Sequence, residues 1–210
     1  MTEIESFIGP DGEPRCFWTG GAPEFLAYHD EEWGYPVDDD TRLFEKLVLE
    51  GFQSGLSWRT ILNKRENFRS AFAGFDVEAV ARFTDRDRAR LLEDAGIVRH
   101  RGKIDAAMNN ARRASDLIDE FGSVGAYVWR YEADDASRPD PITHAWAAST
   151  ATSPESKAMA KDLKKRGWAF VGPTTMYAFM QSMGLVNDHP EDCIVRERCE
   201  AARERFERPV

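Results

Sequence analysis

The chain has 210 residues, of which 42% are hydrophobic, 11% aromatic and 31% charged. This length fits one domain, and the composition is that of a folded globular protein, which excludes a disordered chain. The formal net charge of -9 excludes a histone-like protein with a wholly basic surface. It is compatible with a DNA enzyme whose contact face is locally basic, because phosphates respond to charges within a Debye length of about 10 Å.

The sequence shows neither a membrane span nor a secretory leader. No apolar run approaches the roughly 18 residues of a transmembrane helix, and the start of the chain, MTEIESFIGPDGEPR, lacks an apolar stretch. The cysteines, three in number and spread along the chain, argue against a secreted disulfide scaffold. We therefore expect a soluble, cytoplasmic monomer that does not bind membranes.

Apolar residues at helical spacing recur along most of the chain. After the acidic segment Asp38–Asp40, which is typical of a helix cap, a stripe begins with Leu43 and Phe44 and continues with Leu47 and Val48. Further helices are predicted to begin at Asp76, at about Asp87, near Gly102, at Ser153 and at Gly172. The last two are expected to end at Gly167 and Gly184, since glycine commonly follows a helix.

Strands with alternating apolar and polar residues are not evident, and no internal repeat or low-complexity tract is found. The segment Tyr131–Thr152 contains Pro139, Pro141 and few periodic apolar positions, which predicts a long loop. The sequence therefore predicts an all-α fold in which residues 1–210 form a single domain.

Residue types that ligate metals lie near both ends of the chain. Cys16 and His29 lie near the start, and His189 and Cys193 are four residues apart, on one helical face or in one tight turn. Two thiolates and two imidazoles make a tetrahedral set that Zn²⁺ accepts. On spacing alone, buried cysteines and unrelated histidines are the more common arrangement. Cys199, in the charged tail, is interpreted as a small apolar residue.

Glu50 is the unusual residue of the first predicted helix, because its carboxylate lies at the edge of the apolar stripe. It is either a surface residue or a buried acid with a function, since charged groups are seldom buried unpaired. The run EGFQSGLSW that it begins contains Gly51 and Gly55, which leave room for a group to approach the backbone.

Aromatic residues crowd the N-terminal segment and the end of this run. They are Trp18, Tyr28, Trp33, Tyr35 and Trp58. Clusters of this kind usually belong to the core, but aromatic rings beside a carboxylate are also how proteins hold a flat cation.

A short turn containing glycine joins two predicted helices in the run DAGIVRHRGKIDAAMNNAR. Arg99, His100, Arg101 and Lys103 surround Gly102. Backbone N–H groups at the start of the second helix favour an anion, and Arg and Lys add charge-assisted contacts to a phosphate. The turn is either a helix-hairpin-helix that binds DNA phosphates without reading bases, or a solvated basic turn.

Together these runs resemble the DNA-3-methyladenine glycosylase I family, one of the helix-hairpin-helix DNA glycosylases. The matching runs, in order, are CFW, LAYHDEEWGYP, LFEKLVLEGFQSGLSW, DAGIVRHRGKIDAAMNNA, LKKRGWAFVGPTTMYAFMQSMGLVNDH and the closing Cys193. The resemblance covers residues 16–193, so that 1–15 and 194–210 are extensions. It implies a helix-hairpin-helix glycosylase fold with a zinc site joining the N- and C-terminal segments.

The resemblance also implies which residues form the sites. Those matching the family's structural zinc site are Cys16, His29, His189 and Cys193. Those matching its methyladenine pocket are Trp18, Tyr28, Trp58 and Glu50, with Glu50 in the catalytic role. The expected DNA contacts are Arg99, Arg101, Gly102 and Lys103. Phe25 and Phe52 depart from the family's pattern beside the pocket.

By this resemblance the protein is a monofunctional glycosylase of damaged double-stranded DNA. It hydrolyses the N-glycosidic bond of 3-methyladenine, releases the free base and so begins base excision repair. Methylation at N3 makes adenine a cation and a good leaving group, so extruding and binding the base supplies much of the catalysis. The alternative is a zinc-stapled DNA-binding module without catalysis, in which Glu50 has no role. A zinc hydrolase would need an open coordination position, which four protein ligands close.

Overall fold

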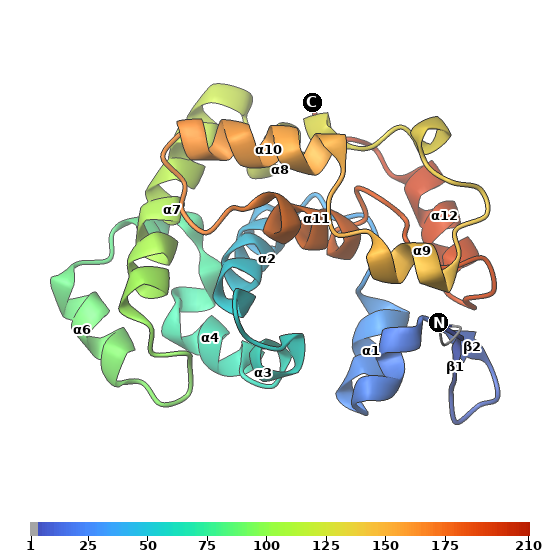
Figure 1. The fold of residues 1–210 in the computed structure, drawn as a ribbon. Coiled ribbons are helices and arrows are strands. Elements are labelled where there is room, and N and C mark those ends of the chain that lie inside the picture. Colours follow the sequence, from blue (N-terminus) through green and yellow to red (C-terminus); the bar gives the residue numbers. More distant parts are fainter. Residues whose placement is uncertain (1–3) are drawn as a thin grey trace.

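The computed structural model describes residues 4–210, which fold mainly into helices (Figure 1). The α-helices are α1 (Glu24–Glu31), α2 (Asp40–Gln53), α3 (Trp58–Leu62), α4 (Arg65–Ala71), α5 (Val77–Ala81), α6 (Asp85–Glu93), α7 (Arg101–Phe121), α8 (Val124–Val128), α9 (His144–Ser149), α10 (Pro154–Lys165), α11 (Pro173–Ser182) and α12 (Arg196–Arg205). The 3₁₀ helices are η1 (Phe17–Gly21), η2 (Ala73–Phe75), η3 (Trp129–Tyr131) and η4 (Asp135–Ser137). None of these helices is both long and apolar enough to cross a membrane, over residues 4–210.

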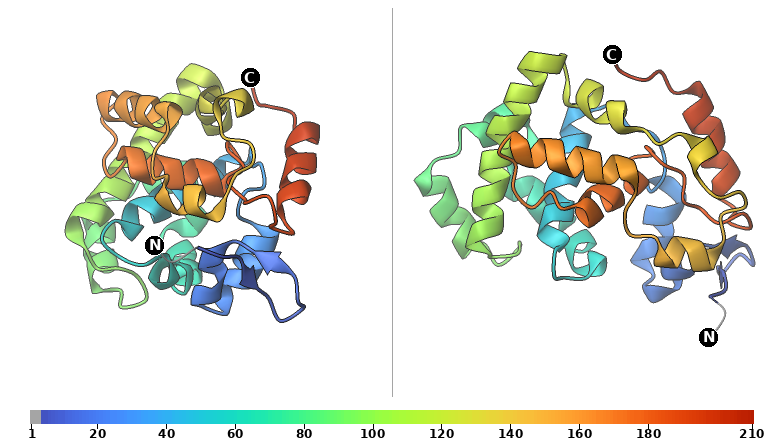
Figure 2. Two further views of the ribbon diagram at one scale, coloured as in Figure 1. Left: turned by 45° about the vertical axis from the view of Figure 1, so that its right-hand side comes forward. Right: turned by 45° about the horizontal axis from the view of Figure 1, so that its top comes forward.

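Helix α2 lies at the centre of the molecule, with α7 and α11 packed against it (Figures 1 and 2). It begins at the predicted cap, where the carboxylate of Asp39 accepts a hydrogen bond from the backbone N–H of Arg42 at 2.8 Å. The predicted apolar stripe is buried, beginning with Leu43 and Phe44. Every residue from 43 to 52 is buried, so over this part of α2 all faces of the helix are enclosed by the protein. The central helix thus carries its polar residues into the interior.

Helices α10 and α11 confirm the predicted start and stop positions. Ser153 caps α10 through reciprocal hydrogen bonds with Ser156, and Pro154 occupies the first helical position. The glycines that follow the two helices, Gly167 and Gly184, have φ angles of 85° and 75°. These left-handed conformations favour glycine and end each helix.

Two features differ from the sequence-based prediction. The segment Tyr131–Thr152, predicted as a loop, contains η4 and α9, and α9 begins where the Thr143 hydroxyl accepts from the backbone N–H of Trp146. A six-residue helix is too short for a helical period to be counted. The strands β1 (Phe7–Ile8) and β2 (Pro14–Arg15) form a small antiparallel hairpin, and two residues per strand are too few to show alternation.

The first and last segments of the chain lie on the same side of the molecule, so that β1, β2 and α1 are near α12 (Figures 1 and 2). The backbone N–H of Ile194 donates to the carbonyl of Pro14 at 3.0 Å, and that of Gly34 donates to the carbonyl of Ser182 at 3.4 Å. Residues that are far apart in sequence are therefore joined directly.

We expect Gly184→Ala to destabilise the protein by about 3 kcal/mol or more. The cost of a left-handed backbone conformation for alanine is added to the cost of a steric clash of its Cβ. A Cβ added at Gly184 would lie 2.5 Å from the backbone nitrogen of Pro36. Gly122→Ala is the matched control, since Gly122 has a φ of 88° but no atom within 4 Å of an added Cβ. Its expected cost is only about 1 kcal/mol. Urea unfolding measures the stability of both variants. Equal losses of stability would show that the close contact between Gly184 and Pro36 does not matter.

Candidate functional site

The four predicted metal ligands meet at one buried point, which we call the Cys/His cluster. The ligand atoms of Cys16, His29, His189 and Cys193 all lie within 4.8 Å of one another. The two Sγ atoms are 4.0 Å apart, and Cys193 Sγ lies 3.4 Å from His29 Nε2. Both distances are near the separations of about 3.6–3.8 Å between ligands around tetrahedral zinc. The hydrogen bond from Cys16 lowers the pKa of Cys193 to about 5. The cluster can therefore hold a metal ion.

Partners outside the cluster orient both imidazoles. His29 Nδ1 lies 2.7 Å from a carboxylate oxygen of Asp30, and His189 Nδ1 lies 2.7 Å from the amide oxygen of Asn187. This leaves Nε2 of each ring for a ligand, and His189 Nε2 is buried with no hydrogen-bond partner in the described part of the chain. Burial lowers the pKa of His189 well below its usual value, which keeps the imidazole in the neutral form that binds metals.

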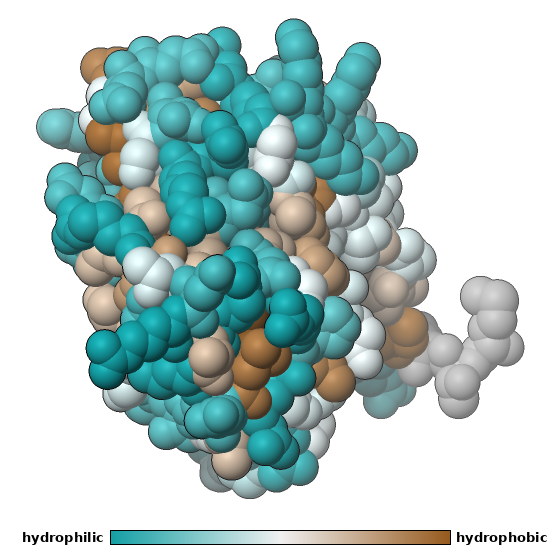
Figure 3. Space-filling model, turned by 90° about the vertical axis from the view of Figure 1, so that its left-hand side faces the viewer, coloured by the Kyte–Doolittle hydropathy of each residue, from teal (hydrophilic) through white to brown (hydrophobic). Residues whose placement is uncertain are grey.

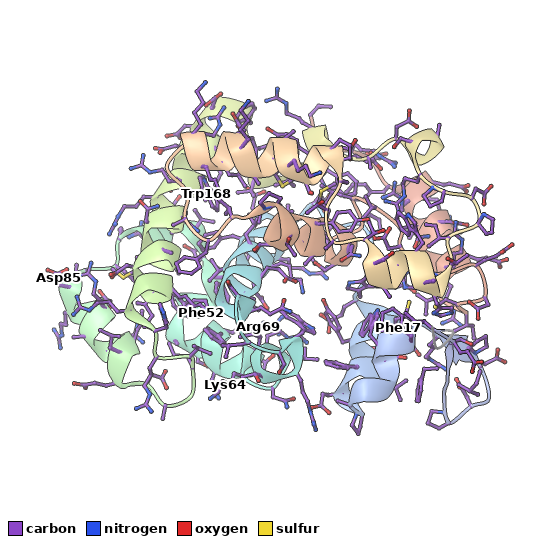
Figure 4. The ribbon with its side chains drawn as sticks, in the orientation of Figure 1. Phe17, Phe52, Lys64, Arg69, Asp85 and Trp168 are labelled. Atoms are coloured by element: carbon purple, nitrogen blue, oxygen red, sulfur yellow. The ribbon has the colours of Figure 1, made fainter. Side chains whose placement is uncertain are left out.

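A cavity of about 400 Å³ lies beside the Cys/His cluster. All four residues predicted for the base pocket line it, namely Trp18, Tyr28, Glu50 and Trp58. Cys16 also lines it, so the cavity and the cluster share a wall. Another side comes from α9 and residues 150 and 151, within the segment predicted as a loop. Phe17 lines the cavity between α1 and α9 (Figure 4). Its size suits a small organic molecule.

Aromatic rings form one wall of this cavity. The ring centroids of Tyr28 and Trp58 are 5.4 Å apart, and those of Trp18 and Tyr28 are 6.3 Å apart. The rings of Trp18 and Trp33 also lie 5.3 and 6.2 Å from His29, so the wall packs directly on the Cys/His cluster. The indole N–H of Trp58 is buried without a hydrogen-bond partner among residues 4–210. A buried donor of this kind is available to a ligand.

Glu50 is a buried acid and not a surface residue, with 5% of its surface exposed. Its Oε1 forms a 2.9 Å ion pair with Nζ of Lys46, one turn earlier on α2. Lys46 also donates a 2.6 Å hydrogen bond to the hydroxyl of Tyr28 and lies 3.5 Å from the ring centroid of Trp58. Burial lowers the pKa of Lys46, and the nearby Glu50 opposes this shift. Lys46 is not among the residues predicted from the sequence, although its spacing of four from Glu50 is that of a helical ion pair.

The cavity has a second carboxylate that is not among the residues predicted from the sequence, that of Asp188. Asp188 is buried, forms an ion pair with Arg138, and accepts 2.7 Å hydrogen bonds from the Tyr177 hydroxyl and the Gln181 amide. Burial raises the pKa of Tyr177 and keeps its hydroxyl protonated as the donor. Asp188 is thus engaged by three side chains, one from the segment before α9 and two from α11, which no local sequence pattern reveals.

The two departures from the family's pattern have different positions. Phe25 lines the cavity. Phe52 lies where α2 meets α4, with 1% of its surface exposed, and its ring packs 4.8 Å from that of Phe68 (Figure 4). Gln53 follows it and does line the cavity, because it is three residues after Glu50 and lies on the same helical face. Phe52 is therefore a core residue, and Gln53 provides the polar group beside Glu50.

The predicted basic turn joins α6 to α7 through residues 94–100. Arg99 and His100 of this turn are exposed, as are Arg101 and Gly102 at the start of α7. Lys103 is only 7% exposed, and its ammonium donates hydrogen bonds to the carbonyl oxygens of Phe52 and Ser54. The sequence predicted that Lys103 contacts a DNA phosphate. The structure corrects this prediction, because the ammonium points inward and is engaged by backbone carbonyls. The carbonyls at the end of α2 lack helical partners and attract this cation inward.

Other contacts hold the turn in place. Lys64, before α4, donates hydrogen bonds to the carbonyls of Ala95 and Gly96, both at 3.1 Å (Figure 4). His100 caps α7, because its Nδ1 accepts from the backbone N–H of Lys103 at 3.2 Å. The side of the molecule that carries α6 and α7 is mostly hydrophilic (Figure 3). The turn is thus an exposed, well-supported basic feature.

The helical fold, the Cys/His cluster and the aromatic cavity with a buried carboxylate together describe a helical protein with a pocket for a small molecule. The sequence matches the model of the family described as methyladenine glycosylase over residues 18–197, close to the predicted range of 16–193. The chain belongs to the methyladenine glycosylase family.

Individual relatives cover most of the chain. It is 46% identical over 182 residues to DNA-3-methyladenine glycosylase 1 of Escherichia coli, covering 85% of this chain and 95% of that one. It is 42% identical over 179 residues to DNA-3-methyladenine glycosylase of Haemophilus influenzae, covering 85% and 96%. A solved structure, described as the structural basis of 3-methyladenine recognition by 3-methyladenine DNA glycosylase I from Staphylococcus aureus, has a TM-score of 0.79 and 35% identity and covers 86% and 95%.

Proposed function

We propose that this protein hydrolyses the N-glycosidic bond of 3-methyladenine in alkylated double-stranded DNA, the first step of base excision repair. The observation that carries this proposal is the buried Glu50 carboxylate in a cavity of about 400 Å³ with aromatic walls. The relatives named above are bacterial, and bacterial genomes lie in the cytoplasm. We expect the protein to act there as a single-domain monomer.

The cavity offers the extruded base three kinds of contact. Methylation at N3 gives the base a positive charge, and the rings of Tyr28 and Trp58 can stack on it, each worth about 0.5–2 kcal/mol. The carboxylate of Glu50 accepts hydrogen bonds from the amino edge and opposes the charge. The side-chain amide of Gln53, which lines the same cavity, can supply a donor for a ring nitrogen. Recognition by burial, stacking and hydrogen bonding suits a flipped-out base.

Hydrolysis then requires water to attack the sugar carbon. The bond to the base breaks as water attacks, the base leaves as a neutral molecule that no side chain has to protonate, and the proton lost by the water passes to solvent. Contacts that are stronger with the departing base than with the substrate in its ground state can then supply most of the rate enhancement. The buried lysines near the cavity are Lys46 and Lys103, and both ammonium groups are engaged, with Glu50 and with backbone carbonyls. This supports a monofunctional enzyme that leaves an abasic site and uses no lysine nucleophile.

We propose that the Cys/His cluster binds one Zn²⁺. Two thiolates and two imidazoles fill a tetrahedral coordination sphere and leave no position for a catalytic water, so the ion would be structural. The unpartnered Nε2 of His189 fits this assignment. Since Trp18 packs on His29, the ion would also hold the aromatic wall of the cavity in place.

Cys193→Ser is expected to lose most of its zinc and at least about 10 °C of melting temperature, because metal binding contributes to folding. Excision should fall only as far as the folded fraction falls. Cys199→Ser is the matched control, a buried thiol outside the cluster, and should keep its zinc. Elemental analysis with circular dichroism measures both. Full zinc content in Cys193→Ser would contradict the assignment.

We propose that the turn between α6 and α7 is a helix-hairpin-helix that contacts DNA phosphates. Arg99 and Arg101 are exposed on either side of the start of α7. Gly102 has no side chain that would keep a phosphate from the backbone N–H groups there. Lys103 acts from the inside and fixes this turn to the end of α2.

Arg101→Met is expected to change DNA binding, whereas Lys103→Met is expected to change the stability of the protein. Arg101→Met should weaken binding to all DNA sequences alike and reduce the salt slope by about one, as for a lost phosphate contact, without loss of stability. Lys103→Met should cost about 2–4 kcal/mol of stability, because helix-end carbonyls lose their donor. Fluorescence anisotropy at two salt concentrations and thermal melting give the answer. Unchanged DNA binding by Arg101→Met would favour the solvated-turn interpretation.

The alternative function, a zinc-stapled DNA-binding module, gives Glu50 no role. Glu50→Gln is expected to fold, keep zinc and lose excision of 3-methyladenine from alkylated DNA by a factor of about 10²–10³, as for a lost electrostatic contact. Glu45→Gln is the matched control, because Glu45 is a buried acid of the same helix that pairs with Arg69 and does not line the cavity. Wild-type excision by Glu50→Gln would support the module instead.

A further inference from the structure

The loop between α10 and α11, residues 166–172, presents one exposed aromatic ring. We propose that Phe170 is a DNA-contacting residue, whose ring packs against sugars of the duplex between the phosphate held at the start of α7 and the base held beside Glu50. This inference rests on the proposed function. Phe170 does not line the cavity of about 400 Å³, so its contact is with the duplex and not with the extruded base.

Phe170 differs from the other aromatic residues in its exposure. Its exposed fraction is 38%, and no other Phe, Tyr or Trp among residues 4–210 is exposed to this extent. Its neighbours Trp168 and Val171 are both buried. The loop is thus anchored in the core on both sides of a ring that remains partly in water.

The backbone at Phe170 has a conformation that favours glycine. Its φ is 57°, in the left-handed region that bulky side chains seldom adopt. Where this conformation follows α7, α10 and α11, the chain has Gly122, Gly167 and Gly184. Phe75 also has a positive φ, but it is fully buried, so core packing explains it. Core packing does not explain the exposed part of Phe170.

Two asparagines of α7 hold the loop in this conformation. The buried amide of Asn110 donates to the carbonyl of Ala169 at 2.9 Å and accepts from the backbone N–H of the same residue at 3.0 Å. Asn109 donates to the carbonyl of Gly167 at 2.8 Å. Strained residues persist where their surroundings over-determine them, and they cluster at functional sites. The helix that begins at the basic turn therefore fixes the position of the ring (Figure 1).

Phe170 lies between the two proposed DNA contacts. On one side, a Cβ added at Gly51, the residue after Glu50, would lie 3.3 Å from the Cβ of Phe170, so glycine permits this close approach. On the other side, the ring centroid of Phe170 lies 6.4 Å from that of His100, which caps α7 beside the exposed Arg101. DNA that contacts both the start of α7 and the cavity therefore passes over this ring.

The chemistry of the ring fits the sugars of DNA. The contacts proposed at the basic turn are with phosphate oxygens, which leaves the apolar surface of the sugars without a partner. A ring that the protein already holds in place loses little conformational entropy when it covers this surface. The contact involves no charge, so it does not depend on salt as a phosphate contact does. Phe170 is thus suited to hold a duplex of any sequence while the base is extruded.

Phe170→Gly removes the ring and adopts the left-handed conformation without strain. Its affinity for duplex DNA that carries a tetrahydrofuran abasic-site analogue should fall by about tenfold, as for the loss of an apolar contact. The dependence of affinity on salt should stay that of the wild type, in contrast to Arg101→Met. Fluorescence anisotropy at two salt concentrations measures both quantities. Binding of free 3-methyladenine, measured by calorimetry at matched folded fraction, should not change.

Two further variants control for the loss of the ring. Phe170→Tyr keeps an aromatic ring at the same point and should recover most of the lost DNA affinity. Ile8→Ala removes an exposed apolar side chain of β1, on the side of the molecule away from α7 (Figure 1). It should bind DNA as the wild type does.

Wild-type DNA affinity in Phe170→Gly overturns the contact. An equal loss of free-base binding, or a salt slope reduced by about one, also overturns it, because the ring would then support only the cavity or the basic turn. A wild type that does not excise 3-methyladenine overturns the proposed function, while the DNA affinities still decide the role of Phe170. If Phe170→Gly does not fold, Phe170→Leu takes its place, since it keeps an apolar side chain against Gly51 and lacks the ring. Full DNA affinity in that variant overturns the inference.

Discussion

The structure depends on the meeting of the two chain ends at the Cys/His cluster. Four buried polar atoms within 4.8 Å are costly to desolvate unless they share a partner. The cluster also supports its surroundings, because the rings of Trp18 and Trp33 pack on its imidazoles at 5.3 and 4.7 Å. These rings belong to the cavity wall, so the position of the wall is determined by the joining of residues from opposite ends of the chain.

The central helix shows how buried charge is tolerated. Burying an ion costs several kcal/mol unless a partner and hydrogen bonds compensate it. Glu45 is paired with Arg69, and Glu50 is paired with Lys46, so each buried acid of α2 has its own cation. Apolar residues of similar size would often be as stable or more stable at such positions. The pair formed by Glu50 and Lys46 is therefore better explained by the place of Glu50 in the cavity wall than by stability.

The same helix connects the cavity to the basic turn. Glu50 lies in its last turns, and Lys103, in the first turn of α7, holds its final carbonyls through hydrogen bonds to Phe52 and Ser54. A phosphate bound at the start of α7 and a base bound beside Glu50 would thus be held by one rigid unit. Because Lys103 points inward, it fixes the proposed phosphate site at the start of α7 relative to the proposed base site beside Glu50. A lysine that pointed into solvent would not join the two helices in this way.

The sequence by itself determined the helical class and the capped starts of α2 and α10, and its resemblance to a family singled out Glu50 and the four residues of the Cys/His cluster. These depend on local periods, on caps such as Asp39 and Ser153, and on residue types whose chemistry is specific. Only the tertiary structure decided that α9 closes one side of the cavity, that Asp188 is engaged, and that Lys46 and Lys103 face inward. A helical period gives the face on which a residue lies but not what that face meets, and the burial of a lysine depends on its partner.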